Sequence, residues 1–164
     1  MAPQLNSSGL DPKNASFKAQ LLGRILVRRM LAHSPTEASE SLTYIAPVLR
    51  VSDISRSLAF YRDRLGFAVE FVYESFYAGV SRDGCHIHLK CSPPPPRDQA
   101  AFERGEQIDI YIGVQSAKTL SERFASAGVA FVVPLRHMPY GTEFYVRDPD
   151  GYALGFVQST PTSE

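Results

Sequence analysis

The sequence has few cysteines, no long apolar run and no excess of charge of one sign, and each absence excludes a class of protein. Cys85 and Cys91 lie six residues apart, about 20 Å along an extended strand and beyond disulfide reach, so we expect reduced thiols. No stretch approaches the roughly 20 apolar residues that span a membrane, and no signal peptide is evident. Seventeen basic residues balance seventeen acidic ones. We therefore expect a cytoplasmic protein with no transmembrane segment and no nucleic-acid partner.

Two common catalytic devices are also missing. The chain has no glycine-rich phosphate-binding loop and no evident arrangement of a Ser or Cys nucleophile with a base. Its 164 residues, 44% of them hydrophobic, suit one globular domain with a sizeable core. Four consecutive prolines at 93–96 predict a stiff spacer, with an SH3-type ligand as the alternative.

Residues 1–43 are expected to form an N-terminal extension, because they lack the β-type alternation that begins at residue 44. Within it, residues 17–32 carry leucine and isoleucine on one helical stripe with arginines outside it, which predicts a short basic amphipathic helix. A Ser-, Thr-, Glu- and Pro-containing linker follows at 33–43. Several roles stay open for this helix: an organelle-targeting segment, a membrane-surface or partner-binding helix, a loosely packed extension, or residues ahead of a translation start near Met30.

From residue 44 the pattern alternates as in β-structure. A strand is expected over about 45–51, and Asp53 or Ser55 can cap a helix that ends at Gly66. Pro47 confines that first strand to an edge or to a position whose N–H is not needed. Strands at 67–73, 76–81 and 85–90 follow, which makes one β-α-β-β-β unit.

The second half of the chain repeats the first. A strand at 108–114, a helix at about 116–127, a strand at 129–134 and a hairpin around the turn 148–151 follow in the same order, after a possible helix at 99–104. We predict an α+β domain at 44–158 of two tandem β-α-β-β-β modules. Module one spans 44–91, a Pro-rich linker 92–98, module two 99–158 and a tail 159–164.

Three motifs in this order resemble the vicinal oxygen chelate superfamily of glyoxalases, bleomycin-resistance proteins and extradiol dioxygenases. They are RVSD at 50–53, FYRDRLGF at 60–67 and YGTEFYVRDPDG at 140–151. The resemblance implies that each module curls its mixed sheet into half of a cup that holds the ligand, often at a dimer interface. It also implies four metal-ligand positions, which here are Ala46, His88, Asp109 and Gly155. Ala46 and Gly155 have no donor atom, so we expect no metal cofactor and a chain closest to the metal-free bleomycin-resistance-like members.

Strand alternation predicts which side chains would line this cup. If the four positions face inward, so do Arg50, His86, Lys90 and Tyr111, while the opposite faces are apolar and pack under the helices. By the same parity Cys85 is expected to be a buried thiol. On the predicted helix side lie Leu49, Val51, Ile87, Leu89, Ile108, Ile110, Ile112, Leu154 and Phe156.

We predict a ligand site built from inward polar groups and from the loop over the cup mouth. The loop and strand near the mouth carry His137, Tyr140 and Glu143, and an aromatic ligand could stack on Tyr140. The predicted ligand-binding residues are His88, Asp109, Tyr111, Arg50, His86 and Tyr140.

The sequence thus predicts a metal-independent, homodimeric protein that sequesters a small aromatic molecule. Arg50 and Lys90 favour a neutral or partly anionic ligand over a cationic one. Two alternatives stay open. One is an enzyme, either a lyase or isomerase with His88 as general base oriented by Asp109, or a dioxygenase-like protein with a non-standard metal site. The other is a regulatory module that acts through the N-terminal helix.

Overall fold

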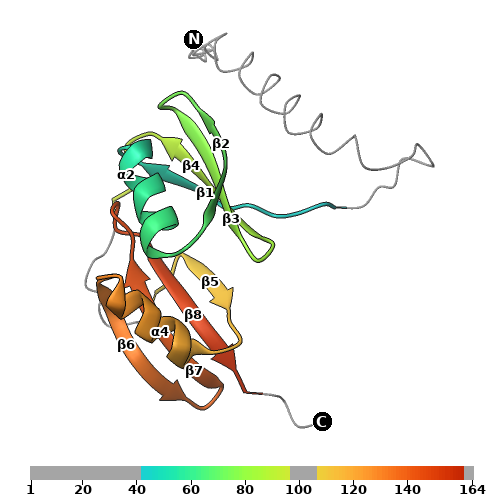
Figure 1. The fold of residues 1–164 in the computed structure, drawn as a ribbon, viewed down its shortest axis with the longest axis vertical. Coiled ribbons are helices and arrows are strands. Elements are labelled where there is room, and N and C mark those ends of the chain that lie inside the picture. Colours follow the sequence, from blue (N-terminus) through green and yellow to red (C-terminus); the bar gives the residue numbers. More distant parts are fainter. Residues whose placement is uncertain (1–41, 97–106, 161–164) are drawn as a thin grey trace, which may run out of the picture. The chain divides into compact units, whose positions relative to one another are not determined.

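The computed structural model describes residues 42–96 and 107–160, which form two β-α-β-β-β modules of the α+β class (Figure 1). Each module has one four-stranded mixed sheet. The predicted tandem repeat is therefore confirmed. The expected helices at 17–32 and 99–104 lie outside the described residues.

In module one, the first and last strands pair in parallel and the helical segment crosses between them. The strand order is β1-β4-β3-β2, with Val48 opposite His88 in the β1–β4 ladder. Asp53 caps the helix by accepting a hydrogen bond from the Arg56 amide at 2.8 Å, as one of the two expected caps. The elements are β1 (Val48–Val51), α2 (Ile54–Ala59), the π-helical turn η1 (Phe60–Arg64), β2 (Ala68–Tyr73), β3 (Tyr77–Arg82) and β4 (Cys85–Cys91).

Module two repeats this arrangement with strand order β5-β8-β7-β6. Ser116 is the helix cap and occupies the place of Asp53. Gly128 follows the helix with φ of 70°, as Gly66 does in module one with φ of 76°, a conformation in which a Cβ is strained. The elements are β5 (Ile110–Gly113), α4 (Ala117–Ser126), β6 (Phe131–Met138), β7 (Gly141–Arg147) and β8 (Ala153–Ser159).

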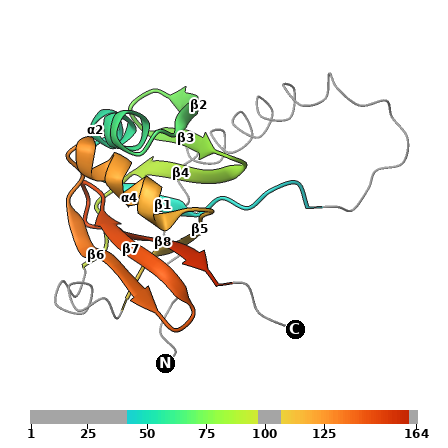
Figure 2. The same cartoon turned by 60° about the horizontal axis from the view of Figure 1, so that its bottom comes forward.

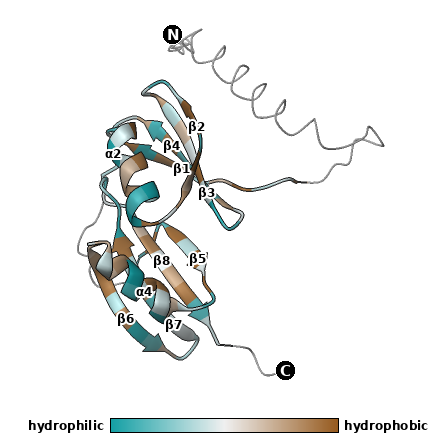
Figure 3. Ribbon diagram, in the orientation of Figure 1, coloured by the Kyte–Doolittle hydropathy of each residue, from teal (hydrophilic) through white to brown (hydrophobic). Residues whose placement is uncertain are grey.

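The hydrophobic core lies between each sheet and its helix, as strand alternation predicts. Hydrophobic residues run along β8 in Figure 3, and Phe144, Phe156 and Phe124 stack or meet edge to face beneath α4. The corresponding buried side chains of module one include Leu49, Val51, Ile87 and Leu89. Each sheet therefore has one face covered by a helix and one face that we call its open face.

The helical segments of the two modules meet at their C-terminal ends (Figure 2). A guanidinium N–H of Arg64 donates to the carbonyl of Ala127, and one of Arg123 donates to the carbonyl of Leu65. Cations at helix C-termini are favourable because unpaired carbonyls gather there. Each module thus donates an arginine N–H to a carbonyl at the end of the other module's helical segment.

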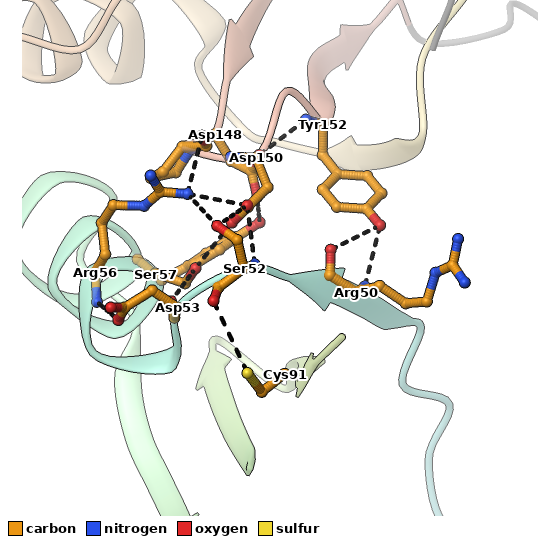
Figure 4. Close-up of polar contacts among 11 residues, drawn as sticks. Arg50, Ser52, Asp53, Arg56, Ser57, Cys91, Asp148, Asp150 and Tyr152 are labelled. Carbon is orange, nitrogen blue, oxygen red and sulfur yellow. Dashed lines mark hydrogen bonds and ion pairs between the residues drawn. The ribbon is translucent and has the colours of Figure 1, made fainter. Parts of the chain in front are cut away.

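A second contact between the modules is not reciprocal. The β7–β8 turn inserts the carboxylate of Asp150 beside β1 and α2 (Figure 4). One of its oxygens accepts hydrogen bonds from the Ser52 amide at 3.0 Å, the Ser52 hydroxyl at 2.6 Å and Arg56 at 2.9 Å. The Asp150 side chain is 2% exposed while that of Arg56 is 51% exposed, so a buried carboxylate is paired with a half-exposed guanidinium group and reinforced by hydrogen bonds.

The rest of the turn supports this carboxylate. Asp148 accepts hydrogen bonds from the amides of Asp150 and Tyr152, and from the buried Tyr61 hydroxyl of module one at 3.1 Å. The Tyr152 hydroxyl donates to the Arg50 carbonyl at 3.1 Å and accepts from the Arg50 amide at 3.0 Å. We call the contacts of Asp148, Asp150 and Tyr152 with module one the turn lock.

Three local expectations differ from the structure. The first strand begins at Val48 rather than near residue 45, because Pro47 has no N–H for a ladder. The strand β6 continues past Pro134 to Met138, where register shifts accommodate the proline, so His137 lies on a strand. Cys85 is exposed because it stands at the start of β4, and Cys91 is the other free thiol.

Among the residues that the structure describes, no helix is long and apolar enough to cross a membrane.

The turn lock predicts a measurable contribution to stability. Asp150→Asn is expected to lower the free energy of unfolding in urea by about 1–2 kcal/mol, because the amide cannot replace an ionised acceptor for Ser52 and Arg56. Asp83→Asn is the matched control in the β3–β4 turn, where the carboxylate is 85% exposed, and should change stability by less than about 0.5 kcal/mol.

The same contact fixes the direction of its pH dependence. Burial raises the pKa of Asp150, but hydrogen bonds from Ser52 and the charge of Arg56 outweigh it and hold the pKa below 3.8. The stabilisation is therefore present at neutral pH and is lost as the pH falls through the folded-state pKa. Equal stabilities of the wild type and Asp150→Asn at neutral pH would contradict the turn lock.

Candidate functional site

An aromatic cluster covers part of the open face of the first sheet. Phe71 and Tyr77 stack with ring centroids 6.1 Å apart, and both meet His88 edge to face at 5.3 and 5.6 Å. Gly79 makes this possible, because a Cβ at that position would overlap the Phe71 ring. The glycine thus lets Phe71 lie flat across β3 toward His88 on β4.

His88 has one ring nitrogen paired and one unpaired. Its Nδ1 lies 3.1 Å from the Tyr77 hydroxyl, while its Nε2 is buried and has no hydrogen-bond partner among the residues that the structure describes. The residue is only 9% exposed. A buried polar atom without a partner costs about 1–3 kcal/mol, so a group that supplied the missing hydrogen bond would be bound favourably.

Burial also sets the charge of this imidazole. Desolvation lowers the pKa of His88 below 6.5, and nearby Glu70 opposes this less strongly. The ring is therefore neutral at physiological pH. If Tyr77 donates to Nδ1, then Nε2 carries the proton and is a donor; in the other tautomer Nε2 is an acceptor.

His86 lies two residues away on the same face and is held differently. Its Nδ1 is 3.0 Å from a Glu70 carboxylate oxygen, and the Tyr44 ring packs on it with centroids 4.6 Å apart. Further along β4, the Lys90 ammonium lies over the Phe76 ring at 5.7 Å. The open face of module one therefore combines aromatic rings with a small number of polar groups.

The open face of the second sheet carries a different cluster, around the buried Glu143. Its carboxylate, 1% exposed, accepts from Arg136 Nε at 2.8 Å, from the Tyr140 hydroxyl at 2.9 Å and from the Tyr145 hydroxyl at 3.2 Å. Every acceptor oxygen is therefore engaged, which is what a buried charge requires.

This cluster fixes Tyr140 at the β6–β7 turn. Burial of its hydroxyl and the hydrogen bond to Glu143 raise the pKa of Tyr140 to about 12, so the phenol stays protonated. Its ring remains half exposed and can still offer a face to a ligand. The full cluster was not anticipated from the sequence, although the spacing of Glu143 and Tyr145 on one strand face was the available signal.

Gly155, at the fourth position where the family resemblance places a metal ligand, is covered. A Cβ on Gly155 would lie 3.2 Å from Ile108 and 3.3 Å from the Tyr145 ring. Ile108 was predicted on the helix side with Ile110, but it precedes β5, so strand alternation does not reach it. It packs on the open face instead.

The remaining predicted site residues contact neighbouring strands or turns and are not part of the aromatic cluster around His88. Asp109 accepts a hydrogen bond from the Ala153 amide at 2.8 Å, and the half-exposed Tyr111 pairs with Ser159 at 3.3 Å. Arg50 is exposed on β1, and its backbone belongs to the turn lock. The general-base hypothesis requires Asp109 to orient the His88 ring. In the structure, His88 Nδ1 is paired with Tyr77 instead.

These residues do not fit the family's metal site. Ala46 and Gly155 have no donor atoms, and Asp109 already binds a backbone amide. Within 42–96 and 107–160, no group of three or more His, Cys, Asp and Glu side chains is placed to hold a metal ion. His88 is the single strong ligand type left at the four positions, and one ligand does not make a catalytic metal site.

The buried imidazole gives a test that needs no ligand. An NMR pH titration should find the pKa of His88 below 6.5. Because the unfolded chain binds the proton more readily, this group should stabilise the fold above that pH and lose its contribution as the pH falls through and below 6.5. A His88 pKa at or above 6.5 would contradict the buried, unpaired geometry.

Solved structures with this fold include both binding proteins and a glyoxalase-related enzyme. A bleomycin-binding protein from bleomycin-producing Streptomyces verticillus, complexed with copper(II)-bleomycin, is 27% identical, with a TM-score of 0.56 over 73% of this chain and 98% of that one. TnmS3, an antibiotic binding protein from Streptomyces sp. CB03234, is 19% identical, with a TM-score of 0.57 over 78% and 100%. A glyoxalase-related enzyme from Clostridium phytofermentans is 16% identical, with a TM-score of 0.60 over 76% and 100%.

The comparison with curated proteins gives no match. A family model does match, over residues 41–156, and its range coincides with the two modules. The resemblance predicted from the three motifs is confirmed. The chain belongs to the Glyoxalase/Bleomycin resistance protein/Dioxygenase superfamily.

Proposed function

We propose that this protein binds and sequesters a small aromatic molecule without a metal, and that the open face of module one carries the site. The observation that carries the proposal is the buried His88 Nε2, which lies among aromatic rings and has no hydrogen-bond partner within 42–96 and 107–160. The 27% identical bleomycin-binding protein supports a binding role for this scaffold.

The chemistry of the face defines the ligand. Phe71, Tyr77 and Tyr44 offer ring faces or edges to a flat molecule, and His88 offers one hydrogen bond. Arg50 and Lys90 on neighbouring strands disfavour a cationic ligand. A neutral or partly anionic aromatic molecule with a carbonyl or phenol group fits this set.

The proposal includes a homodimer in a reducing, cytoplasmic setting. Val48, Tyr111 and Tyr140 are apolar or aromatic side chains at least half exposed on β1, on β5 and at the β6–β7 turn, and a second copy would cover such surfaces. Both cysteines are free thiols. A sedimentation-equilibrium mass equal to the 18.1 kDa monomer would contradict the dimer.

Binding is tested with 1,8-dihydroxyanthraquinone, a flat neutral molecule that carries both carbonyl acceptors and phenol donors. Its visible absorbance should shift on titration with the protein. Tyr77→Phe and His88→Ala should each weaken binding at least about tenfold. Tyr77→Phe removes the hydroxyl that pairs with Nδ1, so the tautomer of the ring is no longer fixed. His88→Ala removes Nε2 itself.

The matched control is His137→Ala, which removes an exposed imidazole from β6, away from the aromatic cluster. It should leave the affinity within about twofold. Equal affinity of the wild type and His88→Ala would place the ligand elsewhere.

Metal independence is tested by thermal unfolding with Ni²⁺, Mn²⁺, Fe²⁺ and Zn²⁺ added singly. A metal that binds only the native state raises Tm as its concentration exceeds its Kd. We expect no such rise that depends on His88, that is, none that is present in the wild type and absent in His88→Ala. A stoichiometric metal, found by elemental analysis and lost in that variant, would instead make this a metalloprotein with displaced ligands.

A further inference from the structure

The turn lock exists in only one of two equivalent places. Asp53 and Ser116 are the equivalent helix caps, 63 residues apart, so Ser52, Arg56 and Ser57 correspond to Gln115, Thr119 and Leu120. In module one the first three residues hold Asp150. By symmetry, the β3–β4 turn should send a similar group toward the equivalent residues of module two.

The β3–β4 turn is too short to do so. It has two residues between its strands, at 83–84, whereas the β7–β8 turn has five, at 148–152. The β7–β8 turn is three residues longer than the β3–β4 turn, and its additional length includes Asp150 and Tyr152. Asp83 instead points to solvent, 85% exposed, and pairs with Arg82 at 3.3 Å.

A cavity lies where the second lock would be. Its volume is about 620 Å³, within the range of small-molecule sites, and Gln115, Thr119 and Leu120 all line it. The cavity thus coincides with the three residues that correspond to the binding partners of Asp150.

The walls of this cavity are apolar with two cations. Phe67, Ile112, Val114, Leu120 and Phe156 supply apolar surface, and Arg82 and Arg123 supply guanidinium groups.

The two guanidinium groups converge on one backbone atom. Both donate to the Leu65 carbonyl, Arg82 at 2.7 Å and Arg123 at 3.5 Å. A single carbonyl oxygen does not use all the donors of two guanidinium groups, which have five N–H groups each. With Asp83 as the single acid of the lining, the cavity keeps a net positive charge.

We propose that this cavity, the Arg82–Arg123 pocket, binds a small organic anion with a flat apolar body, such as an aromatic carboxylate. Its carboxylate would take up guanidinium donors, as Asp150 does with Arg56 in the other half, and its body would lie on Phe67 and Leu120. The pocket is separate from the His88 face, so either site can fail without the other.

The test uses 1-naphthoate and isothermal titration calorimetry on the full chain. We expect one saturable site with a Kd below about 1 mM, a modest affinity suited to so small a ligand. The neutral 1-naphthalenemethanol has nearly the same shape and should bind at least about tenfold more weakly, because it cannot pair with the guanidinium groups.

Variants locate the site. Arg82→Gln and Arg123→Gln should each weaken naphthoate binding at least about fivefold. Arg62→Gln, which removes an exposed arginine paired with Asp63, is the matched control and should have no effect. Thr119→Phe fills the pocket from α4 and leaves both arginines in place, so it should abolish naphthoate binding while 1,8-dihydroxyanthraquinone binding is unchanged.

Cys85 gives a second readout because it lines the pocket and is exposed. Naphthoate should slow its alkylation by iodoacetamide, as followed by peptide mass spectrometry. Cys91 lies beside Ser52 in module one and should react at an unchanged rate. The proposal is overturned if wild-type protein does not bind naphthoate, or if binding survives both Thr119→Phe and the arginine substitutions.

Discussion

The carboxylate of Asp150 is the group on which the arrangement of the two modules most depends. Its side chain is almost fully buried in the middle of the β7–β8 turn, and a buried charge is tolerable only when donors surround it. Ser52, which follows β1, and Arg56 and Ser57 of α2 supply those donors. The neighbouring Tyr152 hydroxyl fixes the same strand by binding both backbone groups of Arg50, so the turn positions β1, which borders the His88 face.

The open face of the first sheet presents aromatic rings and few polar groups. His88 is neutral and held by Tyr77 among aromatic rings, and no carboxylate of the described part of the chain forms a hydrogen bond with it. On the second sheet, Glu143 is fully engaged by Arg136, Tyr140 and Tyr145, so it is not available as a base. Aromatic rings with few polar groups are common in small-molecule sites, which agrees with the binding role proposed above.

Much of the fold could be predicted from the sequence because period-two alternation is a local signal. It placed Ile87 and Leu89 against the helix and His88 on the other face correctly. The alternation failed at Ile108, because this residue precedes β5 and packs on the open face. It also failed to predict the exposure of Cys85, because that residue stands at the first position of β4. The turn lock and the Glu143 cluster could not be predicted, because each depends on side-chain geometry across strands or, as between Ser52 and Asp150, across 98 residues.

That sequence separation has a consequence for the order of folding. Each module can close its own sheet through contacts within about 40 residues, as Val48 and His88 do, whereas the turn lock joins positions more than twice as far apart. Contacts of long sequence separation carry the larger loop-closure cost and tend to form late. The two halves are therefore expected to form their sheets first and to dock through Asp150 afterwards, which makes this one short turn the last part of the domain to become native.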